Sequence, residues 1–145
     1  MTPDAKAAAV ATTMWARDQA SQQLGFELLE VTAGRARLAL TIEQRHCNGF
    51  GVLHGGLLAT LADSAFAFAC NSANALTLAS GFDIDILKSC EAGERIEAEA
   101  RCTHQGGRSG LYDVQVRRGD ELIAVFRGRS QRLKGRFVAP ELEDC

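Results

Sequence analysis

The sequence predicts an α+β domain in which an antiparallel sheet wraps around one long central helix. Three observations support this prediction: one segment is apolar around most of its helical circumference, several others alternate between polar and apolar residues, and the chain has the size of one domain. It has 145 residues, of which 46% are hydrophobic and 23% are charged. This length and composition are typical of a single globular domain.

The central helix is expected from Gly55 to about Asn71. Its apolar side chains cover most directions around the helix axis: Leu57, Leu58, Leu61, Ala62, Ala65, Phe66, Phe68 and Ala69. A helix that is apolar on nearly all sides is buried rather than amphipathic on a surface. This segment is therefore the element around which the rest of the domain is expected to pack.

Strands are expected on both sides of this helix in the chain, because apolar residues recur there at every second position. GFELLEV marks the start of a strand, and the alternating segments are RARLALTI, LTLASGFDIDILK, ERIEAEARCTH, GLYDVQVRR and ELIAVFRGRSQRL. The stretch Arg118-Gly119-Asp120 predicts a hairpin turn between the last two segments. One buried helix surrounded by about five strands, mostly antiparallel, is the description of a hotdog fold.

The Ala-rich N-terminal segment predicts a surface helix over about residues 4–22, followed by a core over about 24–133 and a short C-terminal tail. We assign residues 1–145 to one hotdog domain. The N-terminal segment is a poor signal peptide, because Asp4 adds an acid and its centre is only weakly apolar. No apolar run reaches the about 20 residues that span a membrane. We therefore expect a cytoplasmic protein.

Charge and cysteine content exclude several classes of protein. The net charge of −2 gives no electrostatic argument for binding nucleic acid or an anionic membrane. The five cysteines are odd in number and include no Cys-x-x-Cys pair, so neither a disulfide framework nor a zinc site is expected. We interpret them as reduced thiols: Cys47, Cys70, Cys90, Cys102 and Cys145.

A basic cluster near the C-terminus has two interpretations. It contains Arg127, Arg129, Arg132, Lys134 and Arg136. The cluster can be a solvated strand edge and tail. It can also be a site for a phosphorylated ligand, because guanidinium groups match the geometry of phosphate.

Two glycines, Gly55 and Gly56, open the central helix and suggest an anion site. The first N–H groups of a helix have no acceptor inside it and lie at the positive end of the helix dipole. With no side chain in the way, these groups can hold the oxygen that becomes negative during acyl transfer. The alternative is a tight turn, or close packing of the helix on the sheet.

Asp63 lies in the middle of the same helix, where no residue three or four positions away carries a positive charge. Burial among apolar side chains raises the pKa of a carboxylate and makes it more basic. Asp63 can then act as a general base or a nucleophile near neutral pH. The alternative is a structural Asp that accepts hydrogen bonds from the backbone or from Ser and Thr side chains.

Three further residues are candidates for positions beside the reaction. Asn48 can donate a side-chain hydrogen bond to a carbonyl or a water. His54 can orient the loop or polarise the carbonyl, although a His before two glycines can also be purely structural. Ser80, expected just before the third strand, can hold a water beside Asp63.

The spacing of these groups predicts that two chains share each site. Seven residues separate Gly56 from Asp63, which corresponds to roughly 10 Å along one helix. An oxyanion donor and a base must both lie about 3 Å from atoms of one reacting centre. Antiparallel pairing of two such helices would place Gly56 of one chain near Asp63 of the other. We therefore expect a homodimer with two shared sites.

The stretch NGFGVLHGGLLATLADSAFAFACNS resembles the motif of hotdog-fold acyl-CoA thioesterases of the phenylacetic acid degradation (PaaI) type. The similarity continues through SGFDIDILKSCEAGERIEAEARCTHQGGRSGLYDVQV and AVFRGRSQRL, and it covers roughly residues 24–133. It implies hydrolysis of coenzyme A thioesters, commonly phenylacetyl-CoA and its hydroxylated relatives, in phenylacetate catabolism. It also implies homotetramers built as dimers of dimers, no metal, and no cofactor apart from the CoA carried by the substrate.

The resemblance also implies roles for individual residues. The Asp of the family matches Asp63 as general base or nucleophile. Its helix-start glycine matches Gly56 or Gly55, whose N–H then binds the thioester oxygen. The Asn and His of the family match Asn48 and His54, both near the thioester.

Two parts of the expected site lie further along the chain. A Ser or Thr that orients water in the family matches Ser80. The CoA phosphates typically meet basic and glycine-rich surface segments, for which Arg108, Arg127 and Arg129 are the matching candidates.

Two other functions compete with thioester hydrolysis. A hotdog enoyl-CoA or hydroxyacyl-CoA hydratase needs an acid–base pair that moves a proton at carbon, and His54 with Asp63 can be imagined in that role. A non-catalytic acyl-CoA binding protein on this fold usually carries an added DNA-binding segment, which is not expected here. Fold alone does not decide among them. The arrangement from His-Gly-Gly to Asp63 favours stabilising a carbonyl oxygen and activating water.

Overall fold

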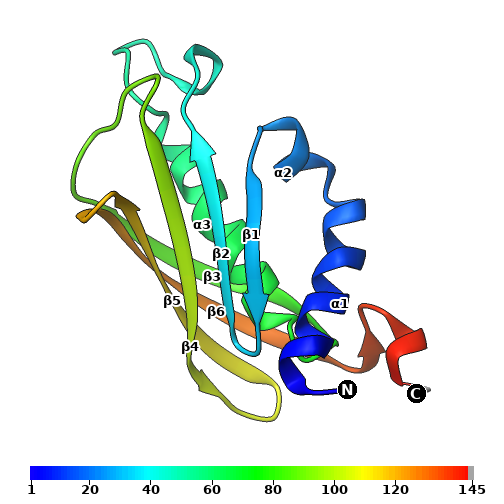
Figure 1. The fold of residues 1–145 in the computed structure, drawn as a ribbon. Helices are drawn as coiled ribbons and strands as arrows, with labels where there is room; N and C mark the ends of the chain where they lie inside the picture. Colours follow the sequence, from blue (N-terminus) through cyan, green and yellow to red (C-terminus); the bar gives the residue numbers. More distant parts are fainter. Residues whose placement is uncertain (144–145) are drawn as a thin grey trace.

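The computed structural model describes residues 1–143, in which one antiparallel sheet of six strands curves around the helix α3 (Figure 1). The helices are α1 (Pro3–Arg17), α2 (Gln19–Gln23) and α3 (Gly55–Cys70), with short 3-10 helices at Gln44–His46 and Pro140–Glu143. The strands are β1 (Glu27–Thr32), β2 (Arg35–Thr41), β3 (Ala75–Ile86), β4 (Arg95–Gln105), β5 (Ser109–Arg118) and β6 (Glu121–Phe137). Their order across the sheet is β1-β2-β4-β5-β6-β3. The predicted hotdog fold is confirmed, with six strands where about five were expected.

The core forms where α3 packs against one face of the sheet. Its buried residues are Leu58, Leu61, Ala62, Ala65, Phe66, Phe68, Ala69 and Cys70. The Phe66 ring lies 5.7 Å from the ring of Tyr112 and 5.9 Å from that of Phe126, measured between centroids. It also faces Gly128, where an added Cβ would come within 2.7 Å of the ring. These contacts fix α3 against β5 and β6.

The N-terminal segment is divided into two helices, whereas a single helix was expected over about 4–22. α1 ends at Arg17, and Asp18 both follows it and caps α2. The Asp18 carboxylate accepts hydrogen bonds from the Ser21 N–H at 2.9 Å and from the Ser21 hydroxyl at 2.7 Å. Asp side chains compete in this way for backbone N–H groups, which favours the start of a new helix over continuation. α1 packs beside β1 at one edge of the sheet (Figure 1).

The turns lie close to their predicted places. The hairpin between β5 and β6 turns at Gly119, whose φ is +60°, so the predicted turn is confirmed. The connection expected over residues 104–110 is shorter, because β4 continues to Gln105 and β5 begins at Ser109. β6 continues to Phe137, beyond the core boundary expected at about residue 133.

β3 forms the edge of the sheet opposite to β1. It has 12 residues, and within residues 1–143 it pairs with β6 alone. Three large apolar side chains along it are well exposed: Leu78 by 53%, Phe82 by 41% and Ile86 by 48%. A long apolar strand edge of this kind is a place where a strand of another chain can pair.

None of the helices in the described part of the chain is long and apolar enough to span a membrane. Cys47, Cys70, Cys90 and Cys102 are free thiols, and Cys145 lies outside the described residues. Over residues 1–143, no group of three or more His, Cys, Asp or Glu side chains is arranged to hold a metal ion.

Candidate functional site

The start of α3 is shaped by His54, the residue before the helix. His54 Nδ1 accepts a hydrogen bond from the Gly56 N–H at 3.0 Å. Nδ1 must be unprotonated to accept this bond, so the ring proton lies on Nε2. The Gly55 N–H has no acceptor within the helix, and no hydrogen bond joins it to another group in residues 1–143. Of the two predicted oxyanion donors, Gly55 therefore has the open N–H and Gly56 has a partner.

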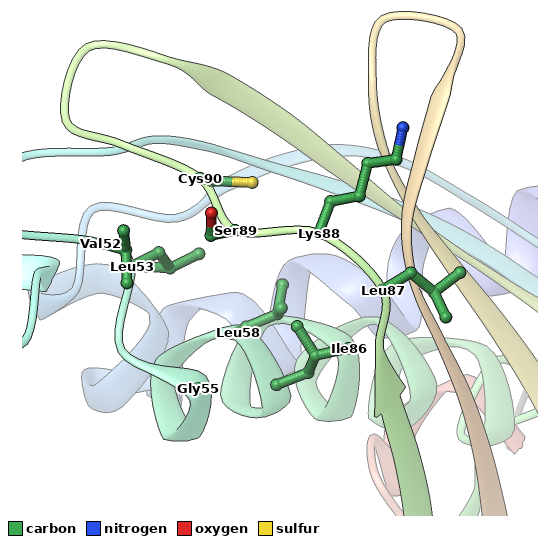
Figure 2. A pocket seen from close by; sticks show the side chains of 9 residues that line it. All are labelled: Val52, Leu53, Gly55, Leu58, Ile86, Leu87, Lys88, Ser89 and Cys90. Atoms are coloured by element: carbon green, nitrogen blue, oxygen red, sulfur yellow. The ribbon is translucent and has the colours of Figure 1, made fainter. Parts of the chain in front are cut away.

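The two glycines also line different hollows. Gly55 lines a pocket of about 250 Å³ together with Leu58, Ile86 and other mainly apolar side chains (Figure 2). Gly56 lines a second hollow with His54. A carbonyl oxygen bound to the Gly55 N–H would thus have an apolar pocket beside it.

Asp63 lies about two turns further along α3 and is half-buried. Its carboxylate makes no hydrogen bond or ion pair with the described residues. Desolvation by burial raises its pKa above the ordinary carboxyl value. A structural Asp held by several N–H or O–H donors would have its pKa lowered instead. The carboxylate is therefore available to take a proton or to attack an electrophile.

Cys70, on the same helix, is a poor alternative nucleophile. Burial raises the pKa of its thiol to about 12, and the negative charge of Asp63 adds to the shift. Attack by cysteine requires the thiolate. Of these two side chains on α3, Asp63 is therefore the stronger candidate for a reactive group near neutral pH.

Asn48 organises the loop that leads into α3. Its side-chain oxygen accepts hydrogen bonds from the N–H groups of Phe50 and Val52, at 2.9 and 3.4 Å. Its side-chain NH₂ has no hydrogen-bond acceptor among residues 1–143. Asn48 therefore shapes the loop with one end of its amide, and the other end has two free N–H donors in the described residues.

His46 is a positioning residue that the sequence reasoning missed. Its ring is buried, with Nδ1 accepting from the Glu43 N–H at 2.9 Å and Nε2 donating to the Leu24 carbonyl at 2.7 Å. Its own carbonyl accepts a hydrogen bond from the His54 N–H at 2.9 Å. His46 thus joins the N-terminal segment to the start of α3. No periodicity marks it, because its partner Leu24 lies 22 residues away in the chain.

Ser80 lies inside β3, so its expected place just before the strand was wrong. The strand starts early, at Ala75, because the turn after α3 is held by Asn71, whose side chain bonds the N–H and carbonyl of Thr77. Ser80 is the extra residue of a bulge in the pairing with β6. Bulges re-aim side chains and are frequent beside functional sites. The Ser80 hydroxyl donates to the Arg129 carbonyl at 3.1 Å.

Three predicted site residues line one hollow of about 580 Å³: Ser80, Arg108 and Arg129. Arg127 is not among its lining residues. Its guanidinium donates two hydrogen bonds to the Asp113 carboxylate, at 2.7 and 2.9 Å. These bonds lower the pKa of Asp113, and they occupy Arg127 on the face of β6 that points away from α3.

One chain does not bring the helix-start donor and the carboxylate to one point. Gly55 and Asp63 are eight residues apart on α3, which corresponds to about 12 Å along its axis. Both groups need to lie about 3 Å from the reacting atoms. Within one chain, the Gly55 N–H and the Asp63 carboxylate are therefore too far apart to act on the same reacting group.

The chain matches the family model described as Thioesterase superfamily over residues 50–125. It is 37% identical over 126 residues to the acyl-coenzyme A thioesterase PaaI of Escherichia coli K12, covering 86% of this chain and 90% of that protein. It is 32% identical over 110 residues to human acyl-coenzyme A thioesterase 13, covering 74% and 79%. The solved structure of the E. coli PaaI protein from the phenylacetic acid degradation operon has a TM-score of 0.90 and 35% identity, covering 93% of this chain and 99% of that one.

Proposed function

Because the chain belongs to the thioesterase superfamily, we propose that it hydrolyses acyl-CoA thioesters, above all phenylacetyl-CoA and hydroxylated phenylacetyl-CoAs, in phenylacetate degradation. The observation that carries the proposal is Asp63, a desolvated carboxylate without a partner in the described chain, on the helix that opens with the free Gly55 N–H. A carboxylate that activates water and a donor for the oxyanion are the two groups that thioester hydrolysis needs.

In the proposed reaction, the thioester oxygen accepts a hydrogen bond from the Gly55 N–H. The Asp63 carboxylate takes a proton from water while the water oxygen bonds to the carbonyl carbon. The C–S bond then breaks, and the CoA thiolate leaves with the proton that Asp63 took from water, which restores the Asp63 carboxylate. In a second route, Asp63 itself attacks the carbon, the thiolate leaves, and water hydrolyses the mixed anhydride. Asn48, His54 and Ser80 hold the carbonyl and the water in place on either route.

The pocket beside Gly55 suits an aromatic acyl group. Its lining is mainly aliphatic, with Val52, Leu53, Leu58, Ile86 and Leu87 around a volume of about 250 Å³ (Figure 2). Transfer of a phenyl ring from water into such a pocket is favourable. Water and the thioester are the only reactants, so the reaction needs no metal and no cofactor beyond the CoA of the substrate. We propose that it takes place in the cytoplasm.

A second copy of the chain completes the site in this proposal. The open edge of β3, with its exposed Phe82 and Ile86, is a surface on which two copies can pair around a twofold axis. Such pairing sets the two α3 helices antiparallel, so that Gly55 of one copy approaches Asp63 of the other. We propose this shared-site dimer as the functional unit, assembled further as a dimer of dimers.

A mixed-dimer experiment tests the shared site. One chain carries Asp63→Asn and the other carries Gly55→Pro, which removes the oxyanion N–H. Proline suits this position, because the first helical residue needs no N–H and His54 before it is extended, with φ −60° and ψ 127°. Each variant alone is expected to be inactive. The mixed dimer is expected to regain about half of the wild-type activity, since one of its two sites is intact.

Gly55→Ala is the matched control for the proline variant, because it adds a Cβ and keeps the N–H. That Cβ would meet Ile86 Cδ1 at 3.3 Å, and this atom ends a partly exposed side chain that can shift. The alanine variant is expected to keep most of its activity. Inactive mixed dimers, formed from well-folded chains, would contradict the shared site.

A panel of thioesters tests the activity itself. Thiol release is measured with phenylacetyl-CoA, hydroxyphenylacetyl-CoA, benzoyl-CoA and straight-chain acyl-CoAs, and we expect the two phenylacetyl esters to have the highest kcat/KM. Hydration of an enoyl-CoA without thiol release would support the hydratase instead. Tight binding of CoA esters with no turnover would support a binding protein.

A further inference from the structure

Residues 46–54 form a small hairpin directly before α3, and an antiparallel bridge joins its two legs. At its base, the His46 carbonyl accepts a hydrogen bond from the His54 N–H at 2.9 Å. Nearer its tip, the Asn48 N–H donates to the Val52 carbonyl at 2.8 Å. The 46–54 hairpin therefore carries two of the predicted site residues, Asn48 and His54, and holds its two legs in register.

The base of this hairpin sets the geometry of the first turn of α3. His54 holds the Gly56 N–H on its Nδ1 at 3.0 Å. The His54 carbonyl also accepts hydrogen bonds from the N–H groups of Leu57 and Leu58, at 2.9 and 3.1 Å. The Gly55 N–H lies between these bonded groups and stays open. Any shift of His54 would therefore move the oxyanion donor as well.

His46 connects the base of the hairpin to the end of α2. Its ring is 1% exposed, and both of its nitrogens are engaged, Nδ1 by the Glu43 N–H and Nε2 by the Leu24 carbonyl. The last carbonyls of a helix have no N–H partner inside it, and Leu24 directly follows the last residue of α2. The same ring therefore caps α2 and anchors the hairpin.

Arg45, the neighbour of His46, makes a parallel connection. Its guanidinium donates to the Gln23 carbonyl at 2.6 Å, one residue before the carbonyl that His46 binds. It also donates to the Glu43 carboxylate, at 3.1 and 3.3 Å. Two neighbouring side chains thus bind two successive carbonyls at the end of α2. The 3-10 turn at Gln44–His46 cannot rotate without breaking both bonds.

We propose that His46 is a positioning residue for thioester hydrolysis, because it holds the base of the 46–54 hairpin against the end of α2. In this position the hairpin presents the Gly55 N–H and the Asn48 amide to the thioester. The inference rests on the proposed function, which gives these two donors their role. Because the ring is buried and both nitrogens are occupied, His46 acts through the hairpin and not on the substrate. The N-terminal segment becomes part of the scaffold of the site.

The test removes the hydrogen bonds of His46 and keeps most of its bulk. His46→Leu makes neither bond, whereas His46→Gln keeps an NH₂ group that can donate to the Leu24 carbonyl. Thiol release from phenylacetyl-CoA is measured below the unfolding temperature of each variant. We expect His46→Leu to lower kcat by about 10- to 100-fold and to change KM by less than about threefold, because a misplaced oxyanion donor weakens transition-state binding most. His46→Gln is expected to regain part of the lost kcat.

Ser72→Ala is the matched control at the other end of α3. Ser72 is also buried, and its hydroxyl accepts from the Gly34 N–H at 2.8 Å and donates to the Ala69 carbonyl at 2.7 Å. Its loss also removes two hydrogen bonds of a buried side chain but leaves the 46–54 hairpin intact, so kcat should stay within about twofold of wild type. Equal losses of kcat in Ser72→Ala and His46→Leu would overturn the positioning role.

Amide hydrogen exchange followed by NMR tests the anchor without turnover. Relative to N–H groups in the middle of β5, those of His54 and Gly56 should exchange at least about tenfold faster in His46→Leu and at the wild-type rate in Ser72→Ala. Unchanged exchange in His46→Leu, or faster exchange with a wild-type kcat, would overturn the proposal. A wild-type protein that hydrolyses no thioester would refute the proposed function, and the exchange rates alone would then decide whether His46 holds the hairpin.

Discussion

Asp63→Asn is expected to lower kcat for thioester hydrolysis by about 10³-fold. The amide is almost the same size as the carboxylate, yet it can neither take a proton from water nor attack the carbonyl carbon. Loss of one positioned base or nucleophile typically costs 10²- to 10⁴-fold. The measurement is thiol release at saturating phenylacetyl-CoA. A variant that keeps more than about a tenth of the wild-type kcat would contradict the role of Asp63.

The pH dependence of wild-type activity is part of the same expectation. Asp63 must be ionised to react, and burial raises its pKa. Activity should therefore fall as the pH drops through a midpoint above the ordinary carboxyl range, where exposed Asp and Glu are still ionised. A midpoint at the ordinary value of about 4 would show that the reacting group is not desolvated.

The free energy of unfolding of the Asp63→Asn variant shows whether a loss of activity comes from the missing carboxylate or from unfolding. Because the pKa of Asp63 is higher in the folded chain, the unfolded chain releases this proton first as the pH rises. The stability contributed by the protonated side chain is present below the ordinary carboxyl pKa and is lost as the pH rises through the raised one. Asn at position 63 does not ionise, so the variant does not lose this stability as the pH rises. It should therefore be at least as stable as wild type at neutral pH.

Gly128→Ala is expected to destabilise the fold by about 2–3 kcal/mol. The new Cβ would lie 2.7 to 2.8 Å from three carbon atoms of the Phe66 ring, which is 1% exposed. The ring cannot move aside easily, because the rings of Tyr112 and Phe126 flank it. Urea unfolding followed by circular dichroism measures the change in the free energy of unfolding.

The matched control is Gly49→Ala, where no atom lies within 4 Å of the added Cβ and φ is not left-handed. It is expected to change stability by less than about 0.5 kcal/mol. A second variant, Gly128→Ala with Phe66→Leu, should recover part of the loss because the smaller side chain makes room. Equal stability of Gly128→Ala and Gly49→Ala would show that α3 can shift on the sheet.

The sequence predicted α3 closely, because its bounds and burial depend on residues within the helix itself. The order of the strands depends on contacts between distant residues, such as the pairing of Arg35 with Arg101, which no local pattern encodes. For the same reason the sequence did not place β3 at the edge. Alternation along β3 is the same at an edge and in the middle of a sheet, so Phe82 and Ile86 gave no sign of their exposure.

The candidate site was predicted as a set of residues, and the structure adds the hydrogen bonds and hollows that distinguish one residue from another. The sequence alone does not distinguish Gly55 from Gly56 as the oxyanion donor. The structure does, because the Gly56 N–H donates a hydrogen bond to His54. Nor does the sequence distinguish Arg127 from Arg129. β6 places Arg127 against Asp113 and Arg129 in the hollow with Ser80, a difference set by cross-strand neighbours.

The open edge of β3 also has a consequence for the newly made chain. In a single copy, this edge exposes unpaired backbone groups and large apolar side chains, which other incompletely folded proteins can bind. The folded monomer is then the species that aggregates or binds chaperones most readily. Since the proposed pairing removes that species by mass action, the rate of synthesis sets how long each copy stays vulnerable.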